Sequence, residues 1–258
     1  MARKCRPKSR PSTMGRKWTQ EDVLAYNIKI VNQDLKTFFG VTDFPSPDVE
    51  GDALTAENFA DATSDGTLNV LLPMDRVTDL GNRESRTLDF VRELFHLPHY
   101  WGMYQKRFFT MGWGLTYLAY QGGKYPWVDA SIMDEFRVLL LVVKVHTHTR
   151  GFDPEPRLIS DAIAAFHNDN IMRVKRLGTN PVASKIMPGI VMDGTMPTFY
   201  KIPITDELVR AVESGEKPNL ETVVHVYVPE VPRPEEGMKP LDNRVIILSC
   251  FEAFKQFL

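Results

Sequence analysis

The sequence predicts an α/β (α+β) protein with a mixed central sheet that is flanked by helices. The first observation behind this prediction is residues 138–143 (VLLLVV), a strand-length run that is apolar at every position. Such a run is typical of a strand buried on both faces, which requires helices on each side of the sheet. The second observation is helical spacing of apolar residues before and after this run, at 88–95 and 158–166. The 258 residues, 43% of them hydrophobic, are enough to bury one large core.

Residues 1–17 predict a disordered basic tail, and residues 18–258 a single α/β domain. The tail contains seven Lys and Arg residues and no acid, although the formal net charge of the whole chain is −2. A short helix, an extended piece and a second short helix are expected over residues 19–40. Residues 41–68 are rich in Asp, Pro, Ser and Thr, which favours an irregular connection.

The middle of the chain predicts a helix, three strands and a second helix. Helical spacing begins at residue 83, and Pro98 ends that helix. The first strand is rich in aromatic residues, and a tight acidic turn joins the second to the third; they are expected at residues 105–120, 128–133 and 137–146. The second helix follows Asp153 and is expected to end near His167, where a cation is favourable to the helix dipole.

The last third of the chain predicts three more strands and two more helices. The strands are expected at residues 187–192, 198–202 and 222–228. One helix should run from Thr205 to a stop at Gly215, and Asp242 is expected to cap the final helix. Cys250 lies in an apolar stretch of that final helix and is expected to be a buried packing residue.

The composition indicates an intracellular protein, nuclear or cytoplasmic. Two cysteines in 258 residues do not make a disulfide framework, so a reducing compartment fits best. The N-terminus lacks the apolar core of a signal peptide, and no apolar stretch has the length of a membrane span, so no membrane partner is expected. The sequence also lacks a Walker-type phosphate loop, a Gly-x-Gly-x-x-Gly fingerprint and a Gly-x-Ser-x-Gly elbow.

Two acids beside the apolar strand are candidates for a Mg²⁺ site. Acids on adjacent strands can share Mg²⁺, which prefers oxygen ligands. Asp129, and with it Asp134, could supply the first carboxylate, but the next strand should then contain an acid, one spacer and a lysine. Lys144 stands where that acid is needed, and its positive charge would repel a divalent ion. The alternative is that Asp129 is an ordinary surface or turn acid without a role in metal binding.

Two histidines at the end of the same strand are candidates for a transition-metal site. His146 and His148 are two residues apart, so their side chains share one face of a strand and could chelate zinc. Asp153 or Glu155 could complete such a site. The alternative is a polar strand end in solvent. Arg157 is expected in the first turn of the following helix, where a cation is disfavoured by the helix dipole, which hints at an anionic partner.

Five stretches carry a family resemblance over nearly all of the chain after the tail. They are residues 18–40 (WTQEDVLAYNIKIVNQDLKTFFG), 128–143 (VDASIMDEFRVLLLVV), 153–166 (DPEPRLISDAIAAF), 186–205 (IMPGIVMDGTMPTFYKIPIT) and 237–257 (GMKPLDNRVIILSCFEAFKQF). In these stretches the chain resembles a large family of intracellular proteins of mushroom-forming (agaricomycete) fungi, a family without a settled activity. The resemblance is specific as family membership and says little about function.

What the resemblance implies is a PD-(D/E)XK nuclease-like core at about residues 83–205. Members carry a Gln-Glu-Asp-Lys-Arg-His-like run after the apolar strand, an Asp on the preceding strand, and a Gln after Asp-Pro-Glu-Pro. In this chain Asp129 is kept, whereas Lys144 stands in place of the acid, His146 in place of the lysine and Arg157 in place of the glutamine. The resemblance therefore implies a degenerate motif in which metal-dependent hydrolysis is lost.

The leading hypothesis is a non-catalytic, nuclease-like domain that acts as a binding or scaffold protein, with nucleic acid as its partner and no cofactor. Lys144, His146, His148 and Arg157 would then form a cationic pocket for a phosphate backbone. The alternative is an enzyme, either a divergent Mg²⁺-dependent nuclease that uses Asp129 and Asp134 or a zinc enzyme centred on His146 and His148. A third hypothesis is a protein-interaction module built on the aromatic residues 100–120, although aromatic residues at such density more often build a core.

Overall fold

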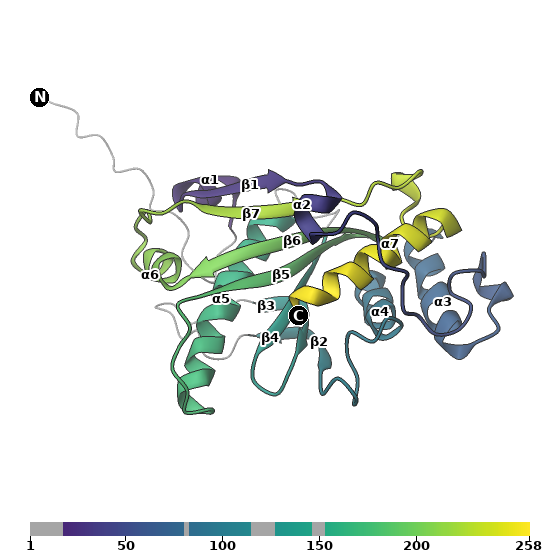
Figure 1. Ribbon diagram of the computed structural model, residues 1–258, viewed down its shortest axis with the longest axis horizontal. Coiled ribbons are helices and arrows are strands. Elements are labelled where there is room, and N and C mark those ends of the chain that lie inside the picture. Colours follow the sequence, from purple (N-terminus) through teal and green to yellow (C-terminus); the bar gives the residue numbers. More distant parts are fainter. Residues whose placement is uncertain (1–17, 80–82, 115–126, 146–152) are drawn as a thin grey trace, which may run out of the picture.

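In the part of the chain that the structure describes, seven strands form one mixed sheet with the order β1-β7-β6-β5-β4-β3-β2 (Figure 1). This computed structural model describes residues 18–79, 83–114, 127–145 and 153–258. The strands are β1 (Ile28–Asn32), β2 (Phe108–Gly114), β3 (Trp127–Met133), β4 (Val138–Lys144), β5 (Ser184–Asp193), β6 (Met196–Thr205) and β7 (Thr222–Tyr227). The pairs β1–β7 and β4–β5 are parallel, and the other neighbouring strands are antiparallel.

Helices cover both faces of this sheet, which confirms the predicted α/β class with a mixed, helix-flanked sheet. They are α1 (Gln20–Ala25), α2 (Leu35–Phe39), α3 (Asp65–Asp79), α4 (Arg83–His96), α5 (Pro154–Lys175), α6 (Asp206–Ser214) and α7 (Leu241–Phe254), with 3₁₀ turns η1 (Phe59–Asp61), η2 (Pro234–Glu236) and η3 (Lys255–Phe257). One core contains residues of α1, α5 and α6, and the other contains residues of α2, α3, α4 and α7. Figure 1 shows α5 and α6 at the left of the sheet and α3, α4 and α7 at the right.

Strand β4 lies between the two cores, as its apolar sequence predicts. Leu141 and Val143 pack into the core on the α5 side, whereas Leu140 and Val142 pack into the core on the α7 side. All four side chains are fully buried. Because burial of one such side chain contributes roughly 1.5–3 kcal/mol, this strand is a main source of stability at the centre of the sheet.

Helix α5 is held close to the sheet by a small residue on β5. A side-chain carbon at Gly189 would lie only 2.9 Å from the Leu158 methyl groups, so glycine permits the approach. The helix continues to Lys175, and the prediction that it ends near His167 is wrong. The polar residues that follow Phe166 do not end the helix, and two of them, Asn168 and Asp169, are buried. His167 is therefore an interior helix residue, with Nδ1 at 3.6 Å from Glu213 Oε1.

Two further helical predictions need correction. The irregular connection predicted at 41–68 ends earlier than expected, because helix α3 begins at Asp65. The proline at position 73 made this helix hard to recognise from the sequence, although Leu71 and Met74 are buried at helical spacing. The final helix starts at Leu241 with Pro240 as its N-cap, so Asp242 lies in the first turn instead. No helix in the described residues is long and apolar enough to cross a membrane.

Candidate functional site

Two acids and one arginine form a buried cluster, the Asp129–Arg157–Asp161 cluster, where the first turns of α5 pack beside β3 and β4. One carboxylate oxygen of Asp129 accepts a hydrogen bond from Arg157 Nη2 at 2.6 Å. The other accepts from the main-chain N–H of Lys144 on the neighbouring strand at 3.1 Å. Asp161 follows one helical turn after Arg157, and its Oδ2 lies 3.7 Å from Arg157 Nε. The two acid side chains are almost completely buried, whereas that of Arg157 is 24% exposed.

The Asp161 carboxylate lacks the partners that its burial demands. Its Oδ2 has no hydrogen-bond partner, because 3.7 Å to the guanidinium is a charge contact that is too long for a hydrogen bond. Burial raises the pKa of Asp161 to about 7, the Asp129 carboxylate adds to the rise, and the Arg157 guanidinium opposes it. With both acids ionised the cluster has one negative charge in excess, and a proton on Asp161 makes it neutral.

A second layer of polar side chains surrounds the start of α5. Asp153 is the N-cap of the helix and accepts from Glu155 N. Gln20 of α1 donates to Asp153 at 3.0 Å and to Glu155 at 3.2 Å, and the Tyr200 hydroxyl of β6 donates to Glu155 at 3.1 Å. Burial raises the pKa of Glu155, and these hydrogen bonds oppose the rise. This layer fixes the orientation of the helix that holds Arg157.

The structure brings together some of the residues that the sequence suggested. Asp129 and Arg157 are in direct contact, and Lys144 joins them through its main-chain N–H. His146 and His148 lie outside the described residues. Asp134, the second acid considered for Mg²⁺, follows the far end of β3 and does not belong to this cluster. Because the Arg157 charge is matched by carboxylates, the part of the expected cationic pocket that depends on Arg157 is close to neutral.

Sequence reasoning missed Asp161, Gln20 and Tyr200. Asp161 lies within the apolar stretch of α5, between the buried residues Ile159 and Ala162. An acid in such a stretch, four residues after an arginine, is a usable signal, since this spacing places the two side chains on one helix face. Gln20 and Tyr200 lie far from α5 in the sequence, so no local pattern connects them to it.

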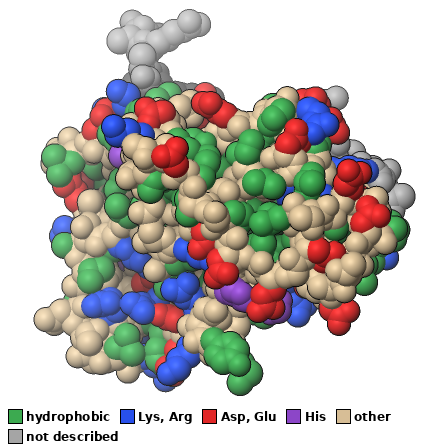
Figure 2. Space-filling view, turned by 45° about the vertical axis from the view of Figure 1, so that its right-hand side comes forward, with side chains coloured by type: hydrophobic (Ala, Val, Ile, Leu, Met, Phe, Trp, Pro, Cys, Tyr) green, Lys and Arg blue, Asp and Glu red, His purple; other side chains and the backbone are tan. Residues whose placement is uncertain are grey.

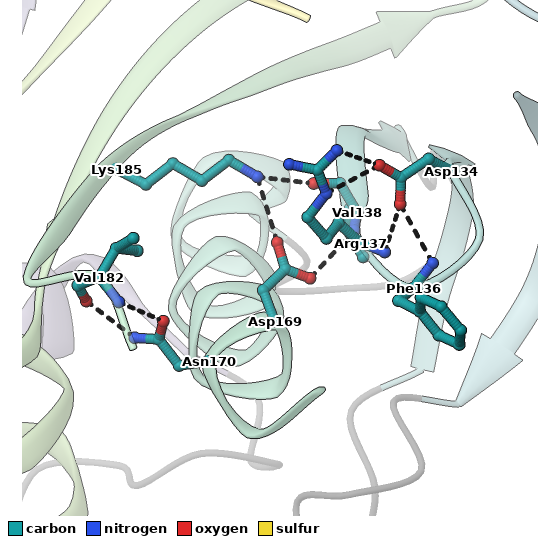
Figure 3. Close-up of polar contacts among 8 residues, drawn as sticks. All are labelled: Asp134, Phe136, Arg137, Val138, Asp169, Asn170, Val182 and Lys185. Atoms are coloured by element: carbon teal, nitrogen blue, oxygen red, sulfur yellow. Dashed lines mark hydrogen bonds and ion pairs between the residues drawn. The ribbon is translucent and has the colours of Figure 1, made fainter. Parts of the chain in front are cut away.

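A second buried acid on α5, Asp169, is the centre of a different polar network (Figure 3). Its Oδ1 accepts from the main-chain N–H of Val138 at 3.0 Å, and its Oδ2 accepts from Lys185 Nζ at 3.1 Å. Lys185 also donates to the carbonyl of Val138 at 2.9 Å. Burial raises the pKa of Asp169. The Lys185 ammonium opposes this rise more strongly than the hydrogen bond from the Val138 N–H does. Both oxygens of Asp169 are therefore satisfied.

Short-range contacts extend this second network, as Figure 3 shows. Asp134 accepts from the side chain of Arg137 and from the main-chain N–H groups of Phe136 and Arg137, which shapes the turn between β3 and β4. Burial alone would raise the pKa of Asp134, but the Arg137 and main-chain hydrogen bonds lower it on balance. Asn170 exchanges two hydrogen bonds with the main chain of Val182. The network ties the β3–β4 turn and the start of β5 to α5.

The groups around Asp129 do not fit the Mg²⁺ ion that was considered for this position. Both carboxylate oxygens of Asp129 accept hydrogen bonds, and one of the two donors is the Arg157 guanidinium. A divalent cation would have to displace these donors and would be repelled by Arg157. In the described residues no group of three His, Cys, Asp or Glu side chains is placed to hold a metal ion.

Comparison with known proteins adds no family to these observations. No protein-family model matches the chain, and no curated protein is significantly similar to it. The functional inference therefore starts from the fold and from the contacts of the cluster.

Proposed function

We propose that this chain is a non-catalytic, PD-(D/E)XK nuclease-like domain that acts as a binding or scaffold protein, with nucleic acid as its partner. The observation that carries this proposal is the Arg157 guanidinium at 2.6 Å from Asp129. In a nuclease of this kind a strand carboxylate holds a divalent ion. Here an internal cation, which belongs to the chain itself, takes that place.

The order of the elements supports the nuclease-like part of the proposal. Helix α4 precedes the antiparallel strands β2, β3 and β4, helix α5 follows, and β5 returns parallel to β4. This is the helix, three strands, helix, strand order that the resemblance implies for the core. Asp129 lies on the second of the three strands and Arg157 on the helix after the third, as the resemblance also implies.

The chemistry of arginine supports the non-catalytic part. A guanidinium stays protonated in proteins, so it cannot act as a base at neutral pH. A metal ion promotes hydrolysis mainly by binding and activating a water molecule at an open coordination position, and a guanidinium has no such position. Asp161 exchanges a proton near neutral pH, but only 4% of this residue is exposed, so a substrate cannot reach it.

Binding of a phosphate backbone would use the end of β4 beside the cluster. Lys144 ends this strand and is half-buried. The Arg157 side chain is 24% exposed, but Asp129 and Asp161 match its charge, so it adds little net positive charge to this surface. Contacts from Lys and Arg to phosphates provide affinity without sequence preference. His146 and His148 follow Lys144 in the chain and remain part of the sequence-based hypothesis for this surface.

Incubation of end-labelled DNA and RNA with the full chain, in Mg²⁺ or Mn²⁺, tests the proposal. We expect no cleavage and a salt-sensitive affinity for the uncleaved strands. Cleavage that disappears in Asp129→Ala would overturn the proposal in favour of a divergent metal-dependent nuclease. About one zinc per chain in the purified protein would instead support a metal enzyme centred on His146 and His148.

A further inference from the structure

The connection between α4 and β2 contains a tight, internally bonded loop, residues 102–107. Gly102 N donates to the carbonyl of Arg107 at 2.9 Å, and Arg107 N donates back to Gly102 at 3.3 Å. A further main-chain bond, from Lys106 N to Met103 O at 3.2 Å, closes the turn. These bonds hold the loop in one shape, so its tip is presented without a large cost of ordering.

The base of the 102–107 loop is anchored in the core. Tyr100 is fully buried, stacks on Phe95 with ring centres 5.1 Å apart, and donates its hydroxyl to the carbonyl of Phe251. The main chain bends sharply on both sides of the tip, since His99 and Lys106 have φ angles of 58° and 52°. Left-handed backbone at non-glycine residues is strained and concentrates at functional positions.

The tip presents two large side chains to solvent. Met103 is 93% exposed and Tyr104 is 99% exposed, the highest values among the large hydrophobic residues of the described chain. Phe108 and Met111 on the edge strand β2 are also exposed, at 42% and 43%. Met103 and Tyr104 form an exposed tip that Phe108 extends along one face of β2, whereas Met111 lies on the opposite face. A single exposed apolar residue needs no explanation, but neighbouring ones at a loop tip are typical of an interaction site.

The charge of the loop itself favours an anionic partner. Residues 102–107 contain two cations and no acid, and the acids near the base of the loop include Glu50, 3.9 Å from His99, and Asp134, which follows Met133, the β3 partner of Phe108. Lys106 and Arg107 belong to the 102–107 loop, and neither makes an ion pair with a carboxylate in the described part of the chain. Figure 2 shows hydrophobic side chains that protrude at the lower edge of one face, with His, Asp and Glu side chains just above them and a mixture of Lys, Arg and acidic side chains at the lower left.

The register of the sheet connects this exposed tip to the Asp129–Arg157–Asp161 cluster. Thr110 pairs with Ser131 and bonds to its side chain, so the two share one face of the sheet. Side chains alternate along a strand, which places Phe108 and Asp129 on that same face. The position opposite Asp129 lies between Met111 and Trp113, five positions along the chain from Arg107, a distance of about 17 Å. Helix α5 packs on β4, β5 and β6, so its contacts lie away from β2.

From these observations we propose that the 102–107 loop is a stacking finger for single-stranded nucleic acid, an inference that rests on the proposed nucleic-acid-binding function. Tyr104 and Met103 contact the faces of unpaired bases, and Lys106 and Arg107 contact the adjoining phosphates. An aromatic tip beside unpaired cations matches the platforms on which single strands stack. The two cations and the absence of an acid within residues 102–107 favour the phosphates of a nucleic acid over an uncharged apolar partner.

Fluorescence anisotropy with labelled 20-nucleotide DNA and RNA strands measures the role of the finger. The full chain should bind, Tyr104→Ala should bind at least about fivefold more weakly, and Tyr104→Trp should retain affinity because stacking needs only an aromatic face. Phe59→Ala is the matched control, since Phe59 is an exposed aromatic residue (44%) on the distant turn η1. Tyr104 is outside the core, so its removal should leave the thermal unfolding midpoint unchanged.

The outcomes separate this inference from the proposed function. Equal affinity of the full chain and of Tyr104→Ala would overturn the finger and leave nucleic-acid binding intact. No binding of any strand by the full chain would overturn both. Photocrosslinking to a strand that contains 5-iodouracil gives an independent reading. The peptide that includes Met103 and Tyr104 should be the labelled one, and labelling elsewhere alone would contradict the finger.

Discussion

Asp161 and Asp169 lie eight residues apart on helix α5, and 4% of each residue is exposed, yet their surroundings differ. Asp169 has a hydrogen bond on each oxygen and a lysine as counter-ion. Among the described residues, Asp161 has an unpartnered oxygen and shares the Arg157 cation with Asp129. The comparison shows that burial alone does not decide what an acid does. Burial raises the pKa of both acids, and the number of partners decides how far the cost of the buried charge is offset.

The largest expected effect comes from removing the satisfied acid. Asp169→Ala should lower the free energy of unfolding by about 4 kcal/mol, because it leaves the buried N–H of Val138 unpaired and removes the counter-ion of Lys185. Urea unfolding measures the loss. Asp206→Ala is the control, since that acid pairs with Arg210 at the surface and should matter by less than about 1 kcal/mol. A loss as small as that of the control would mean that the two regions do not differ as described.

Removing the shared cation should have the next largest effect. Arg157→Gln leaves two buried carboxylates side by side, so the free energy of unfolding should fall by about 3 kcal/mol at pH 8. The loss should be smaller at pH 6, because a proton on Asp161 can replace part of the missing positive charge. Urea unfolding at both pH values checks this, and an equal loss at both would argue against a titrating Asp161.

Asp161→Asn should change the pH dependence of stability. The pKa of Asp161 is about 7 in the folded chain, above its ordinary value of 3.8. The folded state therefore binds more protons between about pH 4 and pH 7, so stability falls as pH rises through this window. Asparagine does not titrate. The variant should gain about 2 kcal/mol relative to the natural chain between pH 5 and pH 8, and parallel curves would rule out a raised pKa.

The smallest expected effect concerns the outer polar layer. Gln20→Ala removes hydrogen bonds to Asp153 and Glu155 that are exposed to solvent, so stability should fall by only about 0.5 kcal/mol. The thermal unfolding midpoint is a sufficient readout. A loss near that of Arg157→Gln would mean that the outer layer, and not the buried cluster, fixes the start of α5.

Features set by local chemistry were predictable from the sequence. The all-apolar run identified β4, and the glycines after α2 and α6 marked the ends of these helices, where Gly40 and Gly215 have φ angles of 74° and 71°. The start of α5 followed from Asp153 and the proline after it, because a capping acid and a proline favour the first turn. In each case the residues that decide the structure are neighbours in the chain.

Features set by distant partners were not predictable in the same way. The length of α5 depends on Asp169, whose partners Val138 and Lys185 come from two strands. Asp129 and Asp134 were considered together as ligands of one Mg²⁺ ion, but Asp134 follows the far end of β3. Only Asp129 of these two contacts α5, through Arg157. The position of Arg157 in the first turn of α5 suggested only an anion from outside the chain. It did not reveal that Asp129 and Asp161 would pair with this side chain.

The most direct test of the central claim, that Arg157 takes the place of a divalent ion, is a calorimetric titration with Mn²⁺. We expect the natural chain to show no binding at this cluster. Arg157→Gln should gain a site, because Asp129 and Asp161 lose their internal cation, and the double variant Arg157→Gln with Asp129→Asn should lose it again. Binding of Mn²⁺ by the natural chain that disappears in Asp129→Asn would contradict the claim.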